Sequence, residues 1–325
     1  MNLSKGINQF LSHCRHVKKL SDHTLKAYSI DLMEFQKFAG AKKFLKNFDR
    51  EHIRNYVQYL FEERQLKESS VKRRVACLKC MFSWYESEEV IQKNPFRILK
   101  LQIKLPKQLP KALTRKEITY LLKYPLKQLG ICGRSSYQNE GVISLINTRQ
   151  DFIQLTIQLI LELLFATGVR VGELSNITIR DISLEDRTIK IRGKGNRERL
   201  VFLPDYQLVA LIRIYIQIRN QFQPNTSNLL INTRGSGINT QLARLLIRRI
   251  AEKAKLKRRI TPHMLRHSAA THLLDSGVDI RHVQKLLGHQ SITTTQIYTH
   301  VSDNKLKSVI SKSHPMGKLL GDKYG

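Results

Sequence analysis

An arginine beside a helix end is the first feature of this sequence that could do chemistry. Arg170 follows Thr167 and Gly168, which end a long apolar helical pattern, and a short helical pattern begins at the next residue. Glu173 lies close enough to orient the guanidinium, whose planar fork matches two oxygens of a phosphate. These residues predict a phosphate contact, with a purely structural arginine–glutamate pair as the alternative.

A second candidate phosphate site lies in the segment TPHMLRH, at 261–267. Thr261 can cap a helix, and Pro262 suits its first turn. His263 then lies at the helix N-terminus, and Arg266 follows one turn later on the same face. Because this end of a helix favours an anion, an imidazole and a guanidinium here predict a phosphate site.

Metal binding is the competing interpretation of the same segment. His263 and His267 have the i, i+4 spacing that serves zinc. The glutamate of the H-E-x-x-H motif is missing, however, and Arg266 would repel a cation. We therefore expect no metal at this site.

A lysine and a tyrosine complete the set of candidates. Lys194 lies between Gly193 and Gly195, where no neighbouring side chain hinders its reach, although a solvated loop lysine is the alternative. Tyr298 lies nine residues after His289 of the sequence LLGH. A phenol is a poor nucleophile at neutral pH, but nearby cations would stabilise the phenolate and the charge that grows on a phosphorane.

The elements that must position these residues are mostly helical. In the first ninety residues, apolar side chains recur at helical spacing after capping signals at 21–22, 49 and 69–70. Asn94 and Pro95 end this pattern, because a residue before proline disfavours the helical conformation. The segment predicts a small helical domain.

The second half of the chain combines helices with three short β-like stretches. We expect an irregular, polar surface loop over 124–150, then a long buried helix that Asp151 caps and Gly168 ends. The β-like stretches are 181–184, 188–192 and 199–203. After these stretches the pattern is helical again up to the C-terminus.

These patterns predict a mainly α fold with a small antiparallel β-sheet. The predicted parts are a helical domain over 1–92, a basic linker over 93–112 and a mixed α/β domain over 113–325. Between 97 and 116 there are seven basic residues and no acidic ones, so this stretch is either a solvated linker or one that also contacts phosphates.

The net charge of the chain points to a polyanionic partner. Lys and Arg total 56 against 26 Asp and Glu, which gives a formal charge of +30. Eight basic residues and one acidic residue lie in 244–259, a pattern that favours a helix following phosphates over a merely solvated face. With 41% hydrophobic residues the chain can build a core, so disorder does not explain the charge.

Cysteine usage and hydropathy indicate a soluble protein of a reducing compartment. Four scattered cysteines do not make a disulfide framework, and the C-x-x-C of Cys77 and Cys80 lies in a helical pattern without a second pair to complete a zinc site. The apolar run 152–165 is too short to span a bilayer and contains Glu162. The first residues, MNLSKGINQFLSHCRH, lack the apolar core of a signal peptide, so we expect a cytoplasmic location without a membrane partner.

Together, the motifs ATGVRVGEL, the Gly193–Lys194–Gly195 hairpin, HMLRH, LLGH and Tyr298 resemble the catalytic signature of the tyrosine recombinases, the phage-type integrases and Xer-type resolvases. The resemblance covers the second domain and extends more weakly into the first, where SDHTLKAYSIDLMEFQKF is similar to the family's helical core-binding domain. It implies a core-binding domain over 1–92 and a mixed α/β catalytic domain over 113–325. The implied catalytic residues are Arg170, Lys194, His263, Arg266, His289 and Tyr298.

The resemblance also implies a role for each of these residues. Arg170 and Arg266 would clamp the non-bridging oxygens of the scissile phosphate, while His263 and His289 would hydrogen-bond it and help to move the tyrosine proton. Tyr298 would attack the phosphorus to give a 3′-phosphotyrosyl enzyme.

Lys194 would complete the reaction as the general acid that protonates the leaving 5′-oxygen. The scheme needs no metal, ATP or other cofactor and no small-molecule substrate. It implies duplex DNA with a specific recombination site as substrate, and a tetramer on two sites, formed by this chain alone or with a paralogous recombinase.

Two other classes of protein remain open at this point. A type IB topoisomerase shares the tyrosine chemistry but relaxes DNA, and a non-catalytic, sequence-specific DNA-binding protein could keep the fold. Within the recombinases, these residues do not separate a mobile-element integrase from a chromosome-dimer resolvase. The sequence assigns no role to 124–150, which looks longer than the corresponding loop in compact family members.

Overall fold

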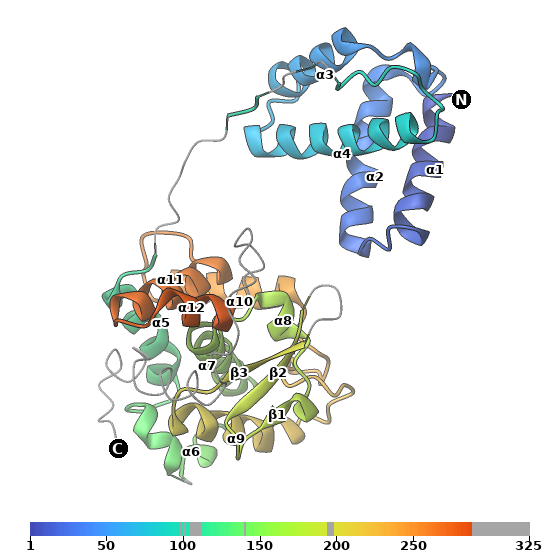
Figure 1. The fold of residues 1–325 in the computed structure, drawn as a ribbon. Helices are drawn as coiled ribbons and strands as arrows, with labels where there is room; N and C mark the ends of the chain where they lie inside the picture. Colours follow the sequence, from blue (N-terminus) through green and yellow to red (C-terminus); the bar gives the residue numbers. More distant parts are fainter. Residues whose placement is uncertain (98, 100–101, 105–111, 140, 194–197, 288–325) are drawn as a thin grey trace. The chain divides into compact units, whose positions relative to one another are not determined.

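The computed structural model describes residues 1–97, 99, 102–104, 112–139, 141–193 and 198–287. The chain divides into two compact units, Met1–Gln108 and Leu109–Gly325 (Figure 1). The linker predicted over 93–112 lies partly outside the described residues. Within them, no helix has the length and apolar character needed to cross a membrane.

The described residues of the first unit form a small bundle of four α-helices with an aromatic core. The helices are α1 (Leu3–His16), α2 (Asp22–Ala39), α3 (Arg50–Glu62) and α4 (Glu68–Ser87), with a 3-10 turn at Leu45–Asn47. Ser21 and Asp49 cap α2 and α3, as predicted, because each side chain accepts the backbone N–H three residues later. Phe35 packs against Tyr56 and Phe82 with ring centroids 4.9 and 6.4 Å apart. The unit therefore has its own core.

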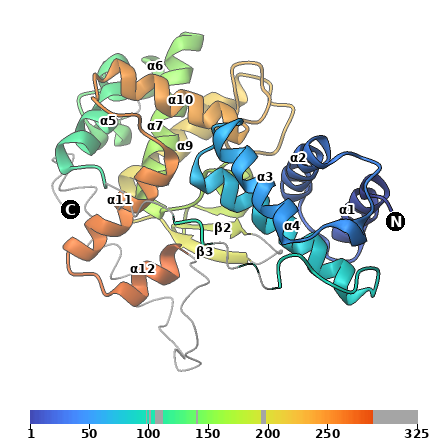
Figure 2. The same ribbon diagram turned by 90° about the horizontal axis from the view of Figure 1, so that it is seen from above.

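The second unit is built around one buried helix, α7 (Arg149–Thr167). Every residue from Gln154 to its end is buried, and α7 packs against helices on several sides (Figures 1 and 2). Its neighbours are α5 (Arg115–Gln128), α8 (Val171–Ser175), α9 (Tyr206–Asn220), α10 (Thr240–Lys253) and α11 (Pro262–Asp275). Most of its side chains are apolar, and Gln154, Gln158 and Glu162, which recur every four residues, form one polar face that is buried as well.

The described part of the second unit also contains a three-stranded antiparallel sheet. The strands are β1 (Ile182–Ser183), β2 (Thr188–Arg192) and β3 (Glu198–Phe202), in that spatial order. Ile189 pairs with Val201, and both side chains are fully buried. The predicted fold class, mainly α with a small antiparallel sheet, is confirmed, and the strands match the three predicted stretches.

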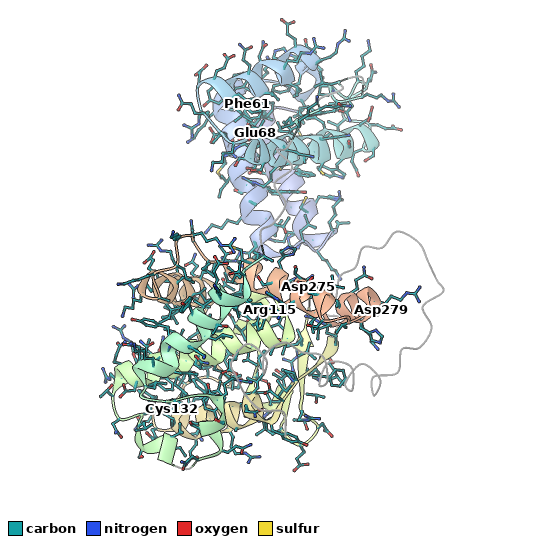
Figure 3. All side chains as sticks on the ribbon, turned by 90° about the vertical axis from the view of Figure 1, so that its left-hand side faces the viewer. Phe61, Glu68, Arg115, Cys132, Asp275 and Asp279 are labelled. Carbon is teal, nitrogen blue, oxygen red and sulfur yellow. The ribbon has the colours of Figure 1, made fainter. Side chains whose placement is uncertain are left out.

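A short helix, α12 (Ile280–Leu287), ends the described part of the second unit. Asp275, the last residue of α11, and Asp279, just before α12, delimit the connection between the two helices (Figure 3). Phe202, from the end of β3, belongs to the same buried apolar cluster as Leu273 of α11 and Leu287 of α12. Strand β3 and α12 thereby share one small apolar cluster.

The prediction of a polar surface loop over 124–150 is wrong. Helix α5 extends to Gln128, and a 3-10 turn (Arg134–Gln138) and the short helix α6 (Gly141–Ser144) follow. Arg134 is buried, and it donates to Glu162 at 2.9 Å and to Asp205 at 2.7 Å. The buried carboxylate of Glu162 in α7 needs a partner of opposite charge, and Arg134 of the 124–150 segment supplies it.

Candidate active site

Arg170 is held at the turn between α7 and α8. Gly168 ends α7 with φ +61°, a left-handed conformation that glycine adopts without steric cost. Two residues later, the backbone N–H of Arg170 donates to Oε2 of Glu173 at 2.9 Å, and its Nη1 donates to Oε1 at 2.9 Å. The Arg170 side chain is 43% exposed, whereas that of Glu173 is 7% exposed. The glutamate therefore orients the guanidinium from the protein side.

Arg199, on β3, contacts the same carboxylate. Its Nη1 donates to Oε1 of Glu173 at 3.0 Å, and its Nη2 donates to Oε2 at 2.8 Å. Burial by itself would raise the pKa of Glu173, but hydrogen bonds from Arg199 and Arg170 outweigh it and lower the pKa to about 2. The sequence analysis did not identify Arg199. In the sequence RER, at 197–199, nothing distinguishes this arginine from a solvated one.

Arg266 lies on α11, where the sequence predicts it. Thr261 caps the helix by accepting the Met264 N–H, and Pro262 is its first residue. The Arg266 guanidinium is buried, and it donates to the carbonyls of Gly168 at 2.5 Å and Leu287 at 2.6 Å. This arginine therefore joins the end of α7 to the end of α12.

The environment of Arg266 is both buried and cationic. Burial is the main cause that lowers the pKa of Arg266 to about 10, and repulsion from Arg170 is the next. At neutral pH the group still carries its charge. The structure thus brings Arg170 and Arg266 together, although they lie far apart in the sequence, and adds Arg199 and Glu173 to them.

Of the other four predicted catalytic residues, the structure describes His263. His263 is exposed in the first turn of α11, the helix that carries Arg266. Lys194, His289 and Tyr298 lie outside the described residues. Their described neighbours in the sequence are the ends of β2 and β3, which flank the hairpin, and the last residue of α12, whose carbonyl Arg266 binds.

Three guanidinium groups and one carboxylate therefore lie together at the start of α8. A phosphodiester carries a delocalised negative charge on two oxygens, and guanidinium forks bind such a group with directed hydrogen bonds. Across the parts of the chain that the structure describes, no group of three or more His, Cys, Asp or Glu side chains has the arrangement of a metal site. The arrangement suits the binding of a phosphodiester.

The basic stretch 244–259 lies on and after α10. Arg244 and Arg249 are exposed, and Arg248 pairs with Glu252 at 3.0 Å on the same helix. Arg258 has a different role, since it donates to Glu117 and to the Ala112 carbonyl at the start of the second unit. Most of the stretch is therefore a basic surface, and one member of it anchors the chain near α5.

Comparisons with known proteins identify the family of this chain. Residues 138–305 match the model of the phage integrase family, and residues 7–89 match the phage integrase N-terminal SAM-like domain. A tyrosine recombinase of Agathobacter rectalis is 33% identical over 97% of both chains. Tyrosine recombinase XerC of Thermodesulfovibrio yellowstonii is 34% identical over 96% of this chain and 97% of its own.

A solved structure gives the same result at the level of the fold. It is the XerH site-specific recombinase bound to its difH substrate in a pre-cleavage complex, with 25% identity and a TM-score of 0.63. The match covers 95% of this chain and 83% of that one. From its sequence, its fold and its cluster of arginines, this chain belongs to the phage integrase family and is a tyrosine recombinase, an enzyme that breaks and rejoins DNA.

Proposed function

We propose that this protein is a site-specific recombinase that cuts and rejoins duplex DNA through a 3′-phosphotyrosyl intermediate on Tyr298, without metal or ATP. The observation that carries the proposal is the convergence of Arg170 and Arg266 at the end of α7. Two fixed guanidinium groups favour the charge that develops on a phosphorane, and they need no reorganisation during the reaction.

The cleavage step is a transesterification. The phenol oxygen of Tyr298 attacks the phosphorus, the P–O5′ bond breaks, and a P–O bond to tyrosine replaces it. The tyrosine proton leaves with the help of His263 and His289, and Lys194 gives a proton to the 5′-oxygen. Because one phosphodiester bond replaces another, no external energy is needed to reverse the step with a 5′-hydroxyl of a partner strand.

The substrate proposed for this chain is duplex DNA with a specific recombination site. A charge of +30 and the exposed arginines of α10 support a polyanion, and the similar XerH recombinase is seen with its DNA substrate. Exchange of strands between two duplexes needs four cleavages, so we propose a tetramer on two sites. Its four subunits are copies of this chain or include a paralogous recombinase.

The experiment is to denature cells that express the protein and to sequence the DNA that remains attached to it. The proposal expects adducts at one repeated sequence, and none with the Tyr298→Phe variant, which should still bind DNA. Adducts that persist in Tyr298→Phe would refute the assigned nucleophile. Tyrosine-dependent adducts without sequence preference would support relaxation of DNA by a type IB topoisomerase instead.

A covalent intermediate that religates quickly would escape detection in cells, so the experiment has a second arm with purified protein and DNA. A duplex nicked close to the cleavage site loses the 5′-hydroxyl fragment, so that the covalent intermediate cannot religate and accumulates. Absence of an adduct on such a substrate would leave only the non-catalytic DNA-binding protein.

A further inference from the structure

Glu173 is shared between two arginines in an unequal way. Arg199 binds both carboxylate oxygens through its two terminal nitrogens, at 3.0 and 2.8 Å. The Arg170 side chain contacts one of them, through Nη1 at 2.9 Å. The two-pronged contact is the stronger form of this ion pair, so the charge of Glu173 is compensated mainly from β3.

The burial of the three side chains separates their roles. Glu173 is 7% exposed and Arg199 is 19% exposed, whereas Arg170 is 43% exposed. Nε of Arg199 is buried and finds no acceptor in the part of the chain that the structure describes, which is a cost of keeping a guanidinium there.

Charge balance explains what Arg199 adds to the site. Among the described side chains, Arg170, Arg266 and Glu173 would have a net charge of +1 without Arg199, because Arg170 and Glu173 are neutral as a pair. With Arg199, three guanidiniums face one carboxylate, and the group has a net charge of +2. Attack by a phenolate on a phosphodiester gives a phosphorane with two negative charges, so the larger positive charge favours the transition state. The field of Arg199 also reaches Arg266, whose pKa is lowered by burial first, and then by Arg170 and Arg199.

We propose that Arg199 is a positioning residue of the active site: it compensates the charge of Glu173, so that Arg170 keeps its orientation and Glu173 does not offset its positive charge at the scissile phosphate. This inference rests on the proposed function, in which Arg170 and Arg266 bind that phosphate. The alternative is an ion pair that only fastens β3 to α8. The two roles can be distinguished. If Arg199 only fastens β3 to α8, its loss should harm the enzyme whether or not Glu173 is charged. In the proposed role, the harm comes from the uncompensated charge of Glu173.

The test compares Arg199→Gln with the double variant Arg199→Gln/Glu173→Gln in the full-length protein. The substrate is a nicked duplex with the sequence recovered from the covalent adducts, and the rate of adduct formation is measured with saturating enzyme. Arg199→Gln should slow the reaction by about 10- to 100-fold while DNA affinity changes little. The double variant should recover at least about fivefold of this loss, because it removes the uncompensated carboxylate.

A substrate without charge gives a second, independent readout. A methylphosphonate at the scissile position lacks the negative charge of the phosphodiester, so the penalty for Arg199→Gln should shrink by about tenfold on it. Arg192→Gln is the matched control: Arg192 lies on the adjacent strand β2 and pairs at 2.9 Å with Asp181, whose side chain is 3% exposed. A loss caused by that substitution should be the same on both substrates.

Each result decides for or against the inference. A double variant as slow as Arg199→Gln, or an equal penalty on both substrates, would show that Arg199 only fastens the strand. If Arg199→Gln fails to fold, Arg199→Lys is used instead. Because this variant conserves the charge, retention of most of the activity would support the inference. A loss of more than about 100-fold would oppose it. Arg170→Gln is assayed in parallel: near-normal cleavage by that variant would overturn the proposed phosphate clamp itself, and not only the role of Arg199.

Discussion

At the scale of single residues, Arg266 combines two tasks that need a guanidinium. Its donors hold the carbonyls of Gly168 and Leu287, and the same charge lies beside Arg170. A lysine has one nitrogen on a flexible stem and cannot span both carbonyls in a fixed geometry. The ends of α7 and α12 thus depend on the same side chain that the proposed mechanism uses.

We therefore predict that Arg266→Lys is severely impaired although its charge is conserved. Cleavage of a nicked substrate should fall by at least about 100-fold. Amide hydrogen exchange in α12 should become faster, because the bond to the Leu287 carbonyl is lost. Cleavage within about threefold of the wild type, or unchanged exchange in α12, would contradict the bridging role.

Glu173 predicts a pH dependence of stability. Its pKa is about 2 in the folded protein, below the ordinary value of 4.5, so ionised Glu173 stabilises the folded state at neutral pH. That contribution, on the order of 3 kcal/mol, is fully present above about pH 4.5 and is lost as the pH falls towards 2. Urea unfolding at several pH values should show that Glu173→Gln is less stable at pH 7 and that the difference narrows below pH 4.5. A difference independent of pH would contradict the ionised pair.

At the scale of elements, Gly168 lets α7 and α12 approach each other. Its φ is +61°, and a Cβ there would lie 2.6 Å from Cδ2 of Leu287. Gly277, after α11, has φ +84°, but among the residues that the structure describes no atom lies within 4 Å of the place that a Cβ would take. The two glycines share the left-handed conformation and differ in the space around them.

Gly168→Ala should therefore cost more stability than Gly277→Ala. The left-handed conformation costs about 1–2 kcal/mol in either variant, and overpacking against Leu287 adds about 1–3 kcal/mol in the first. Thermal or urea unfolding measures both, and cleavage should decrease only in Gly168→Ala, since its clash displaces the end of α12. Equal losses in the two variants would mean that Leu287 adapts to the added methyl group.

Features made by interactions between residues close in the sequence could be predicted from it, whereas contacts between distant residues could not. Thr261 and Asp49 were identifiable as caps because the hydrogen bond that each accepts lies three residues away. The burial of Arg134 could not be predicted, because its partner Glu162 lies on helix α7 and a polar segment gives no periodic signal. The contact between Arg199 and Glu173 depends in the same way on how β3 packs beside α8.

At the scale of the whole molecule, the charge of +30 makes DNA binding strongly dependent on salt. Each phosphate contact releases condensed counterions from DNA, so the slope of log affinity against log salt counts the contacts. If the exposed face of α10 follows phosphates, Arg244→Gln should reduce the magnitude of this slope by about 0.9 on any DNA sequence.

Arg213→Gln is the matched control for this measurement. It removes one exposed arginine from α9 and leaves the net charge equal to that of the α10 variant. Fluorescence anisotropy over a series of salt concentrations measures both slopes. Equal slopes in the two variants would show that α10 contributes only through the overall charge.

The most direct test of the central claim is to identify the bond between protein and DNA. Adducts trapped on a nicked duplex are digested with protease and nuclease, and the linked peptide is sequenced by mass spectrometry. We predict a phosphate that joins Tyr298 to a DNA 3′ end, and a free 5′-hydroxyl on the released strand. A linkage to another residue, or to a DNA 5′ end, would contradict the account.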